Sequence, residues 1–350
     1  MSIYLITGGA GFIGSHLANT LLRAGHEVRV VDDLSTGCRE SLEPAVELIE
    51  GDVADVALMW RAADGVAGVF HLAATTSAAR CREQWPAAHR TNQAGSVAVF
   101  DAARERGQIP VCYASSAAVY GDQGHRAIQE GTRARPMTAL GTDKLGSEFQ
   151  AAIAFRAHGV PNLGLRMFHA YGPRSAIQPP YPDVVATFAA RILAGQVITL
   201  HGDGLQSRDF VHVFDVVRYF FAGMQVLQRK PQSLVLNLCT GRATSIRGLA
   251  DLMGVVAARV PLVQFGPARA GDPRALLGDP NEAIHVLGVE AGIDLEAGLR
   301  SLLPVVAPPA PGWLRHAPPA SMGITQMAQP HPVPAAMPPA DRAIARLRAG

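Results

Sequence analysis

The chain has 350 residues, of which 48% are hydrophobic and 17% charged, and its formal net charge is +2. This composition indicates one large or two smaller globular domains with enough apolar material for a core. The near-neutral charge, without any Lys/Arg run, argues against nucleic acid or an anionic membrane as a partner.

Four scattered cysteines without a CxxC pair fit a reduced, cytoplasmic location and predict neither a disulfide framework nor a metal site. The N-terminus "MSIYLITGG" lacks the basic region of a signal peptide. No apolar run approaches the roughly 18–20 residues of a membrane span, so we expect no membrane partner.

The first 160 residues alternate between strand and helix signals. Helical stretches at 12–25 and 87–106 separate apolar, β-branched runs, which are "IYLIT", "EVRVVD", "VELIEGD", "GVFHLAA" and "IPVCYASS". Such alternation predicts an α/β fold with a doubly wound parallel sheet. Beyond residue 160 the elements shorten, and Pro and Gly breaks predict a smaller C-terminal region that caps the sheet.

We therefore predict three parts: a dinucleotide-binding domain over 1–165, a partly interwoven substrate-binding region over 166–303, and a tail over 304–350. The tail is rich in Pro and Ala and holds 11 of the 25 prolines. A segment of this composition cannot form regular backbone ladders, so we expect it to be disordered.

The first strand runs into a glycine-rich turn. Thr7, Gly8, Gly11 and Gly14 form a TGxxGxxG pattern that opens a helix. The glycines permit a tight turn and let a pyrophosphate approach the helix N-terminus. Asp32 ends the second strand, where a carboxylate can bind both ribose hydroxyls and would repel a 2′-phosphate. The sequence thus predicts a Rossmann domain that binds NAD in preference to NADP.

Further cofactor contacts are expected at the carboxyl ends of the other strands. The third strand leads into "GDV", whose Asp52 and Val53 suit the adenine, and the fourth into "HLAA", whose small residues admit the nicotinamide ribose. The remaining predicted cofactor residues are Phe12, Ile13, Asp33, Leu72, Ala73, Ala74 and Asn92. His71 is expected to be a core histidine.

Ordered motifs over about residues 1–300 resemble one family. They are "TGGAGFIG", "DDLSTG", "GDVAD", "HLAA", "TNQAGS", "YASSAAVYGD", "RMFHAYGPR", "GDGLQSRDFVHVFDVV" and "RAGDPR". They resemble the extended short-chain dehydrogenase/reductase family of NAD-dependent nucleotide-sugar epimerases and dehydratases, in its UDP-glucose 4-epimerase-like branch. The resemblance implies bound NAD, a nucleoside-diphosphate-sugar substrate, and a homodimer formed through helices near 92–106 and 141–158.

The resemblance also implies site residues. Ser116 would bind the reacting sugar hydroxyl, and Lys144 would bind the nicotinamide ribose. Ala117 and Ala118 stand where dehydratases of the family carry an acidic pair, which favours epimerase chemistry. Ser77, Arg208, Arg269 and Asp272 would contact the substrate, the arginines at its phosphates.

The family's catalytic tyrosine corresponds to Leu140, which cannot take a proton. His169 replaces the usual asparagine of the "RMFHAYGPR" motif and can titrate near neutrality, so it is our first substitute base. Asp143 is the second, although it lies about 60° from Leu140 around a helix at 100° per residue. The family's usual tyrosine–lysine arrangement is therefore incomplete in this chain.

Three functions remain open from the sequence. The first is an NAD-dependent nucleotide-sugar epimerase, acting at C4 of a UDP-sugar with an atypical base. The second is a dehydratase or ketoreductase of the same family. The third is a regulatory protein that binds NAD and a sugar nucleotide without turnover.

Overall fold

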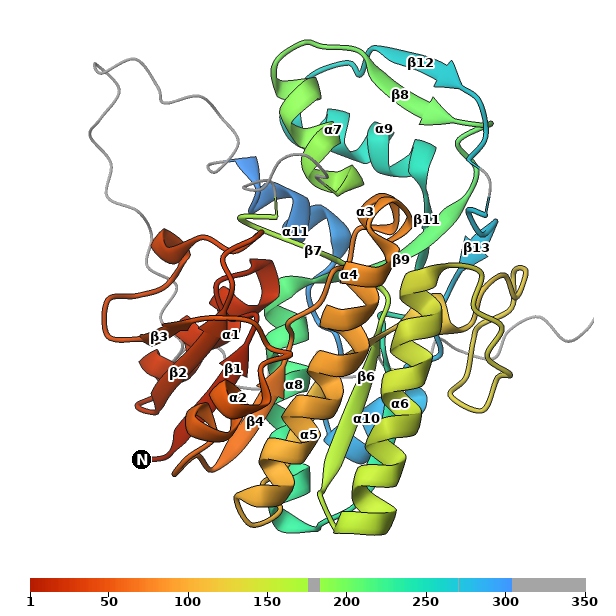
Figure 1. The fold of residues 1–350 in the computed structure, drawn as a ribbon. Helices are drawn as coiled ribbons and strands as arrows, with labels where there is room; N and C mark the ends of the chain where they lie inside the picture. Colours follow the sequence, from red (N-terminus) through yellow and green to blue (C-terminus); the bar gives the residue numbers. More distant parts are fainter. Residues whose placement is uncertain (176–182, 270, 304–350) are drawn as a thin grey trace, which may run out of the picture. The chain divides into compact units, whose positions relative to one another are not determined.

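The structure is a computed structural model that describes residues 1–175, 183–269 and 271–303, drawn in Figure 1. Its centre is a seven-stranded sheet in the order β10-β6-β5-β4-β1-β2-β3, with every neighbouring pair parallel. The strands are β1 Ile3–Thr7, β2 Glu27–Asp32, β3 Glu47–Glu50, β4 Gly68–His71, β5 Val111–Ser116, β6 Asn162–Met167 and β10 Ser233–Leu238. The predicted doubly wound α/β fold is confirmed.

Helices cover both faces of this sheet (Figure 1). On one face lie α1 Phe12–Arg23 and α8 Val213–Arg229, and on the other lie α2 Val56–Ala62, α5 Gly95–Glu105 and α6 Ala139–His158. Along β1, Tyr4 and Ile6 pack into the core beside α1 and α8, while Leu5 packs into the core beside α2 and α5. This two-sided burial is why the strands are almost continuously apolar.

The chain order of the strands reverses between β1 and β4. The crossovers from these two strands leave toward opposite faces of the sheet, so their carboxyl ends border a crevice where ligands of such sheets bind. The switch point places the glycine turn after β1 beside the segment after β4.

The C-terminal region has a smaller core of its own, which includes Phe188, Leu249 and Met253. A four-stranded sheet joins β11, β9, β13 and β7, and a second pair joins β12 and β8. The elements are β7 His169–Tyr171, α7 Val184–Leu193, β8 Ile198–His201, β9 Ser207–His212, β11 Ala243–Ser245, α9 Ile246–Ala257, β12 Val263–Gly266, β13 Ala275–Leu276, α10 Asn281–Leu287 and α11 Leu295–Arg300.

The described residues belong to one compact unit. Within it the chain moves between the two regions: β7 leaves the main sheet after β6, and α8 and β10 return to it. The predicted tail over 304–350 lies outside the described residues. In the part of the chain that the structure describes, no helix is long and apolar enough to cross a membrane.

Candidate active site

The turn between β1 and α1 leaves backbone N–H groups free at the start of a helix. Helix α1 begins after Gly11 without a side-chain cap, and no acidic residue lies in its first turn. A Cβ on Gly14 would lie 2.1 Å from the carbonyl oxygen of Gly8, which itself has a φ of +70°. Only glycine allows this close turn, and the free N–H groups with the helix dipole suit an anion such as a pyrophosphate.

Asp32 lies at the carboxyl end of β2, beside this turn. The N–H groups of Ala10 and Leu34 each donate to its carboxylate at 2.9 Å. Burial raises the pKa of Asp32, and the two backbone donors oppose that rise. The bonds orient the carboxylate, which lines the crevice and can accept from ribose hydroxyls.

A cavity of about 470 Å³ runs along the carboxyl ends of the strands. Its lining combines the predicted cofactor residues with the predicted reacting residues. Those that line it are Gly8, Gly11, Phe12, Ile13, Gly14, Asp32, Asp33, Asp52, Val53, Leu72, Ala73, Ala74, Ser116, Lys144 and His169. Leu140, at the position where the resemblance expects a tyrosine, lines the cavity as well.

Two predicted cofactor residues support the cavity wall and are not among the residues that line it. The Thr7 hydroxyl lies 2.8 Å from Nδ1 of His71 and accepts from the Ala73 N–H at 3.3 Å. The Asn92 side chain accepts from the Thr75 N–H at 2.8 Å and donates to the Thr75 carbonyl at 3.2 Å. Both residues hold the segment after β4 in place.

Helix α6 presents Leu140 and Lys144 to the cavity. The helix begins after Thr138, whose hydroxyl accepts from the Gly141 N–H at 3.1 Å. A Cβ on Gly141 would lie 2.4 Å from the carbonyl oxygen of Ala118, so glycine lets the helix approach the end of β5. The cap and this close contact position one face of the helix, where Lys144 is only 4% exposed.

Asp143, the second candidate base, is buried against a neighbouring helical turn. Its Oδ1 lies 2.7 Å from Nδ1 of His89, at the end of α4 (Trp85–His89), and its Oδ2 accepts from Asn92 at 3.2 Å. Asn92 belongs to a π-helical turn, η2 Arg90–Ala94. Asp143 does not line the cavity, so this geometry suits a residue that anchors α6 to the turn.

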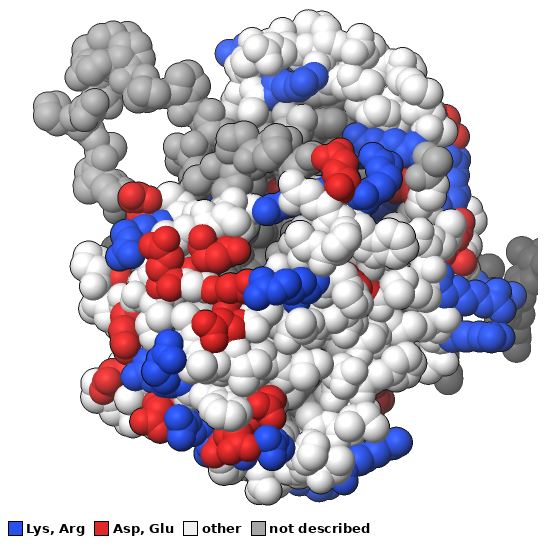
Figure 2. All heavy atoms as spheres, viewed as in Figure 1, with Lys and Arg blue, Asp and Glu red and all other residues white. Residues whose placement is uncertain are grey.

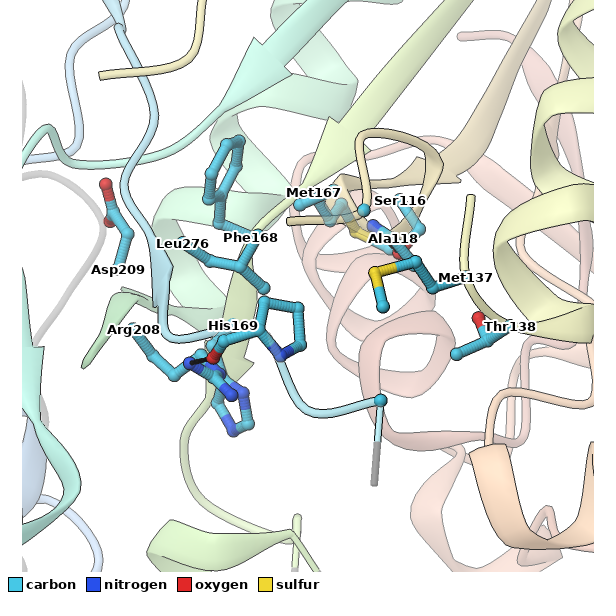
Figure 3. Close-up of a pocket in the computed structure, with 14 residues that line it drawn as sticks. Ser116, Ala118, Met137, Thr138, Met167, Phe168, His169, Arg208, Asp209 and Leu276 are labelled. Atoms are coloured by element: carbon cyan, nitrogen blue, oxygen red, sulfur yellow. Dashed lines mark hydrogen bonds between the residues drawn. The ribbon is translucent and has the colours of Figure 1, made fainter. Parts of the chain in front are cut away.

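A smaller cavity of about 190 Å³ extends from Ser116 toward Arg208 (Figure 3). The Ser116 hydroxyl accepts from the Ala118 N–H at 3.1 Å, which leaves its own proton free to donate. Between the two ends the lining is largely apolar, and it comprises Ala117, Ala118, Met137, Met167, Phe168 and Leu276.

His169 and Arg208 lie close together in this smaller cavity (Figure 3). The His169 ring packs edge-on against Phe210 with ring centroids 4.9 Å apart, and its Nε2 is buried without a hydrogen-bond partner among the described residues. Burial lowers the pKa of His169, the charges of Asp183 and Asp272 oppose this, and that of Arg208 adds to it. The imidazole is therefore neutral near pH 7 and can accept a hydrogen bond.

Arg208 lines the smaller cavity, whereas the other predicted substrate residues, Ser77, Arg269 and Asp272, line neither cavity. The Arg208 guanidinium donates to Asp272 and to the Pro273 carbonyl at 3.0 Å. Arg269 is exposed, and the Ser77 hydroxyl caps α3 (Ala78–Glu83) by accepting from the Arg80 N–H at 3.2 Å. Arg208 thus already has a carboxylate partner in place of a phosphate.

Several residues of the site escaped the sequence analysis. Arg80 and Thr91 line the large cavity, as does Asp183, whose carboxylate caps α7. Met137 and Leu276 line the smaller one. Thr91 opens the "TNQAGS" motif, which suggested only Asn92, and the others lie in a short helix, in loops or at element ends without a periodic signal. His71 pairs with Thr7 and with Ser96 at 3.0 Å, so it is the core histidine that was expected.

No group of three or more His, Cys, Asp or Glu side chains among the described residues could hold a metal ion. The glycine turn, the oriented Asp32 carboxylate and the buried Lys144 amine instead fit a dinucleotide: a free helix end for its pyrophosphate, an acceptor for one ribose, and a donor for the other.

Known proteins match this architecture over most of the chain. A UDP-glucose 4-epimerase of Azospirillum brasilense is 31% identical over 298 residues, which cover 81% of this chain and 86% of that protein. The solved UDP-glucose 4-epimerase of Thermotoga maritima with UDP-glucose has a TM-score of 0.81 and 32% identity, covering 87% of this chain and 98% of that one. The Thermus thermophilus UDP-glucose 4-epimerase in complex with NAD has a TM-score of 0.79 and 30% identity over the same shares.

The description of the matching family is "NAD dependent epimerase/dehydratase family", and the match spans residues 4–239. The predicted family and its cofactor, NAD, are thereby confirmed. The glycine turn, Asp32, Ser116 and Lys144 all lie within the matched residues, and the chain belongs to the NAD dependent epimerase/dehydratase family.

Proposed function

We propose that this chain interconverts the C4 epimers of a UDP-sugar through a transient keto sugar, with a proton acceptor other than tyrosine. The observation that carries the proposal is the single cavity that joins the dinucleotide turn to Ser116 and Lys144. The matched relatives are 4-epimerases of UDP-glucose. Epimerisation needs oxidation, rotation of the sugar and reduction from the other face.

NAD supplies the acceptor and donor of hydride when it is bound. The protein's part is to hold it: the N–H groups at the start of α1 for the pyrophosphate, Asp32 for the adenosine ribose, and Lys144 for the nicotinamide ribose. Ser116 at the end of β5 would hold the reacting hydroxyl in the same cavity. Binding and orientation are thus assigned to groups that the fold already positions.

The atypical base follows from Leu140, whose side chain faces the cavity where the resemblance expects a phenol. His169 is the substitute that the sequence suggests, and its unpartnered Nε2 supports a role toward the substrate. Asp143 is the weaker candidate because its carboxylate is bound to His89 and Asn92. Loss of turnover in His169→Asn, with a changed pH profile, would support His169 as the base.

The diphosphate of the substrate would bind beside Arg208, with Arg269 and Asp272 nearby. Arg208 is only 9% exposed and lines the smaller cavity from the end opposite Ser116. A diphosphate would take over the donors that now contact Asp272, and the paired N–H groups of an arginine fit phosphate oxygens. The smaller cavity would thus join a site for the reacting hydroxyl with a site for the phosphates.

We also propose a homodimer through the outer faces of α5 and α6. Figure 2 shows a largely uncharged surface over these helices. Val97 on α5 and Phe149 and Ile153 on α6 are 45%, 64% and 54% exposed. Apolar side chains clustered on long helices are typical of an interface between subunits. Sedimentation of the wild type and of Phe149→Asp tests this proposal.

Two other functions compete with epimerisation. A dehydratase needs an acid to remove a hydroxyl, and Ala117 and Ala118 supply none at the end of β5. A regulatory protein would bind NAD and the sugar nucleotide through the same cavity without turnover. The buried Lys144 favours an enzyme, because a protein that only binds has less need of an amine in so costly a position.

The decisive experiment incubates the purified protein and NAD with UDP-glucose, UDP-galactose and their N-acetylated counterparts, and follows the anomeric protons by NMR. Interconversion of one pair supports the proposal. A keto or deoxy product would identify a dehydratase or ketoreductase, and binding of both ligands without any product would identify a regulatory protein.

A further inference from the structure

Lys144 is one of only two lysines in the sequence, the other being Lys230. Lys230 lies exposed at the end of α8, whereas Lys144 is 4% exposed and lines the large cavity. Among the described residues, no side chain or carbonyl forms a hydrogen bond or ion pair with Nζ of Lys144. Burial of an ammonium without such a partner is costly, so this site makes loss of the proton easier than in water.

The groups around Lys144 do not hold its proton strongly. The Asp143 carboxylate is bound to His89, which is 60% exposed, and to Asn92. The other titratable groups nearby are the Cys81 thiol on α3, the neutral His71 on β4, and Glu148 one turn further along α6, whose charge Arg166 balances. Burial lowers the pKa of Lys144 to about 8, although Asp143 and then Cys81 act to raise it.

Leu140 cannot take the proton, and His169, although it lines the same large cavity, lies beside Arg208. Leu140 lines the same cavity one helical turn before Lys144 and has no acid–base group. His169 lies on β7, whose strand partner is β9, and its ring contacts Phe210. Figure 3 shows His169 beside Arg208, across the smaller cavity from Ser116.

Ser116 can connect Lys144 with a sugar hydroxyl. Its oxygen already accepts from the Ala118 N–H, so its own hydrogen is available to donate while the oxygen accepts a second proton. Ser116 and Lys144 lie in the lining of one cavity, on β5 and on the helix that packs over it. Because the two side chains are not hydrogen-bonded to each other, a relay between them passes through a hydroxyl or water in this cavity.

We propose that Lys144 is itself the proton acceptor of this site, in place of the missing tyrosine. This inference rests on the proposed epimerase function. Ser116 Oγ takes the proton of the reacting hydroxyl and passes its own through a bridging water or ribose hydroxyl to neutral Nζ, so an ammonium forms and the serine is unchanged. Bound NAD would supply the hydride acceptor, so that the carbon–oxygen bond of the sugar could become a carbonyl. Lys144 and Ser116 would give the proton back along the same path when the alcohol forms again.

The presence of only two lysines makes the protonation state of Lys144 measurable without any turnover. Protein labelled with ¹³C at lysine Cε, as purified with NAD, gives two side-chain signals, and Lys144→Arg assigns them. We expect the Lys144 signal to titrate near pH 8. A midpoint for Lys144 at or above roughly 10.4, the value of a lysine side chain in a model peptide, would overturn the proposal.

Kinetics of matched variants then separate a proton acceptor from a fixed positive charge. Lys144→Arg keeps the charge and the donors but cannot lose a proton, so turnover should fall by roughly 10²-fold or more while NAD stays bound. Turnover of the wild type should rise with pH around 8, as Lys144 loses its proton. His169→Asn should lower turnover but leave this rise at the same pH. If Lys144→Arg retains turnover, or if the rise disappears in His169→Asn, Lys144 is not the acceptor.

The two proposals fail in different ways. If no nucleotide sugar is turned over by the wild type, the epimerase function fails, and the acceptor role fails with it even if Lys144 titrates near pH 8. If the wild type is active but the lysine signal titrates at its ordinary value, the epimerase function stands and only the acceptor role is lost.

Discussion

The two ends of the large cavity differ in what determines their chemistry. At the cofactor end the backbone determines how a ligand can bind. Gly8 and Gly14 leave no room for a Cβ, and backbone N–H donors orient Asp32. At the reacting end the backbone only presents side chains: the Thr138 cap and Gly141 hold the start of α6, whatever residue occupies position 140. Cofactor binding can thus persist while the proton path changes.

The largest expected effect comes from restoring the tyrosine. Leu140→Tyr should raise turnover by roughly 10²-fold, because a phenol beside the Lys144 ammonium is a better-placed acceptor, and general-base help is worth roughly 10²–10⁴. Its pH profile should no longer follow the lysine. Steady-state rates between pH 6 and 10 measure both, with Leu140→Phe as a control of similar size. Equal gains in the two variants would show that only packing had changed.

A substitution at the cofactor end should weaken the binding of NAD and leave the proton transfer unaltered. Gly14→Ala places a methyl group against the Gly8 carbonyl, and overpacking of about 1–3 kcal/mol predicts a loss of NAD affinity of roughly 10–100-fold. Calorimetric titration of NAD measures it. The control is Gly131→Ala, where a Cβ meets no atom within 4 Å. Unchanged affinity in Gly14→Ala would mean that the turn is not the pyrophosphate site.

A smaller change is expected in cofactor choice. The wild type should bind NAD much better than NADP, because the Asp32 carboxylate repels a 2′-phosphate. Asp32→Ala should narrow that preference by roughly 10-fold, about 1.4 kcal/mol, as expected for one lost charge interaction. Competition between the two cofactors measures it. Equal affinities in the wild type would contradict the role of Asp32.

The smallest effect concerns the buried histidine beneath the cofactor end. Burial, and secondarily the charge of Lys144, lower the pKa of His71 to about 3 from an ordinary 6.5. Between about pH 6.5 and pH 3, His71 therefore binds a proton in the unfolded chain but not in the folded chain. This contribution to stability is complete above pH 6.5 and is lost as the pH falls toward 3.

Between pH 7.5 and 5.5 this loss should be about 1 kcal/mol for His71. Urea unfolding at several pH values measures it. His71→Gln retains groups able to bond to Thr7 and Ser96, so its stability should fall less over that interval than that of the wild type. An identical pH slope in the two proteins would show that His71 is not the group responsible.

The cavity residues that were predicted correctly are those whose position follows from local sequence signals. The glycine turn and Asp32 follow from where a strand ends and a helix begins, and the fold is fixed by the alternation of the same elements. Thr7 and Asn92 behave differently because their partners are distant: the Thr7 hydroxyl bonds to His71, 64 residues later. Nothing local indicates whether such a side chain faces a ligand or the wall behind it.

Asp143 illustrates the same limit at the reacting end. Its angle around α6 is readable from the sequence, but its partner is a π-helical turn about 50 residues earlier. Such a turn has no periodic signal, so the pairing with Asn92 was not foreseeable. Met137 and Leu276 reach the smaller cavity from a loop and a two-residue strand, which carry equally little local information.

The capped start of α6 fixes the backbone at position 140, so that a different functional group can be introduced there by substitution. Thr138 and the tight contact at Gly141 set where the next side chain points, and that side chain enters a preformed cavity one turn from a buried amine. A carboxylate, thiol or imidazole introduced at position 140 would border the same large cavity without a change in the backbone. The acid–base character of this part of the cavity can thus be set by the single residue at position 140.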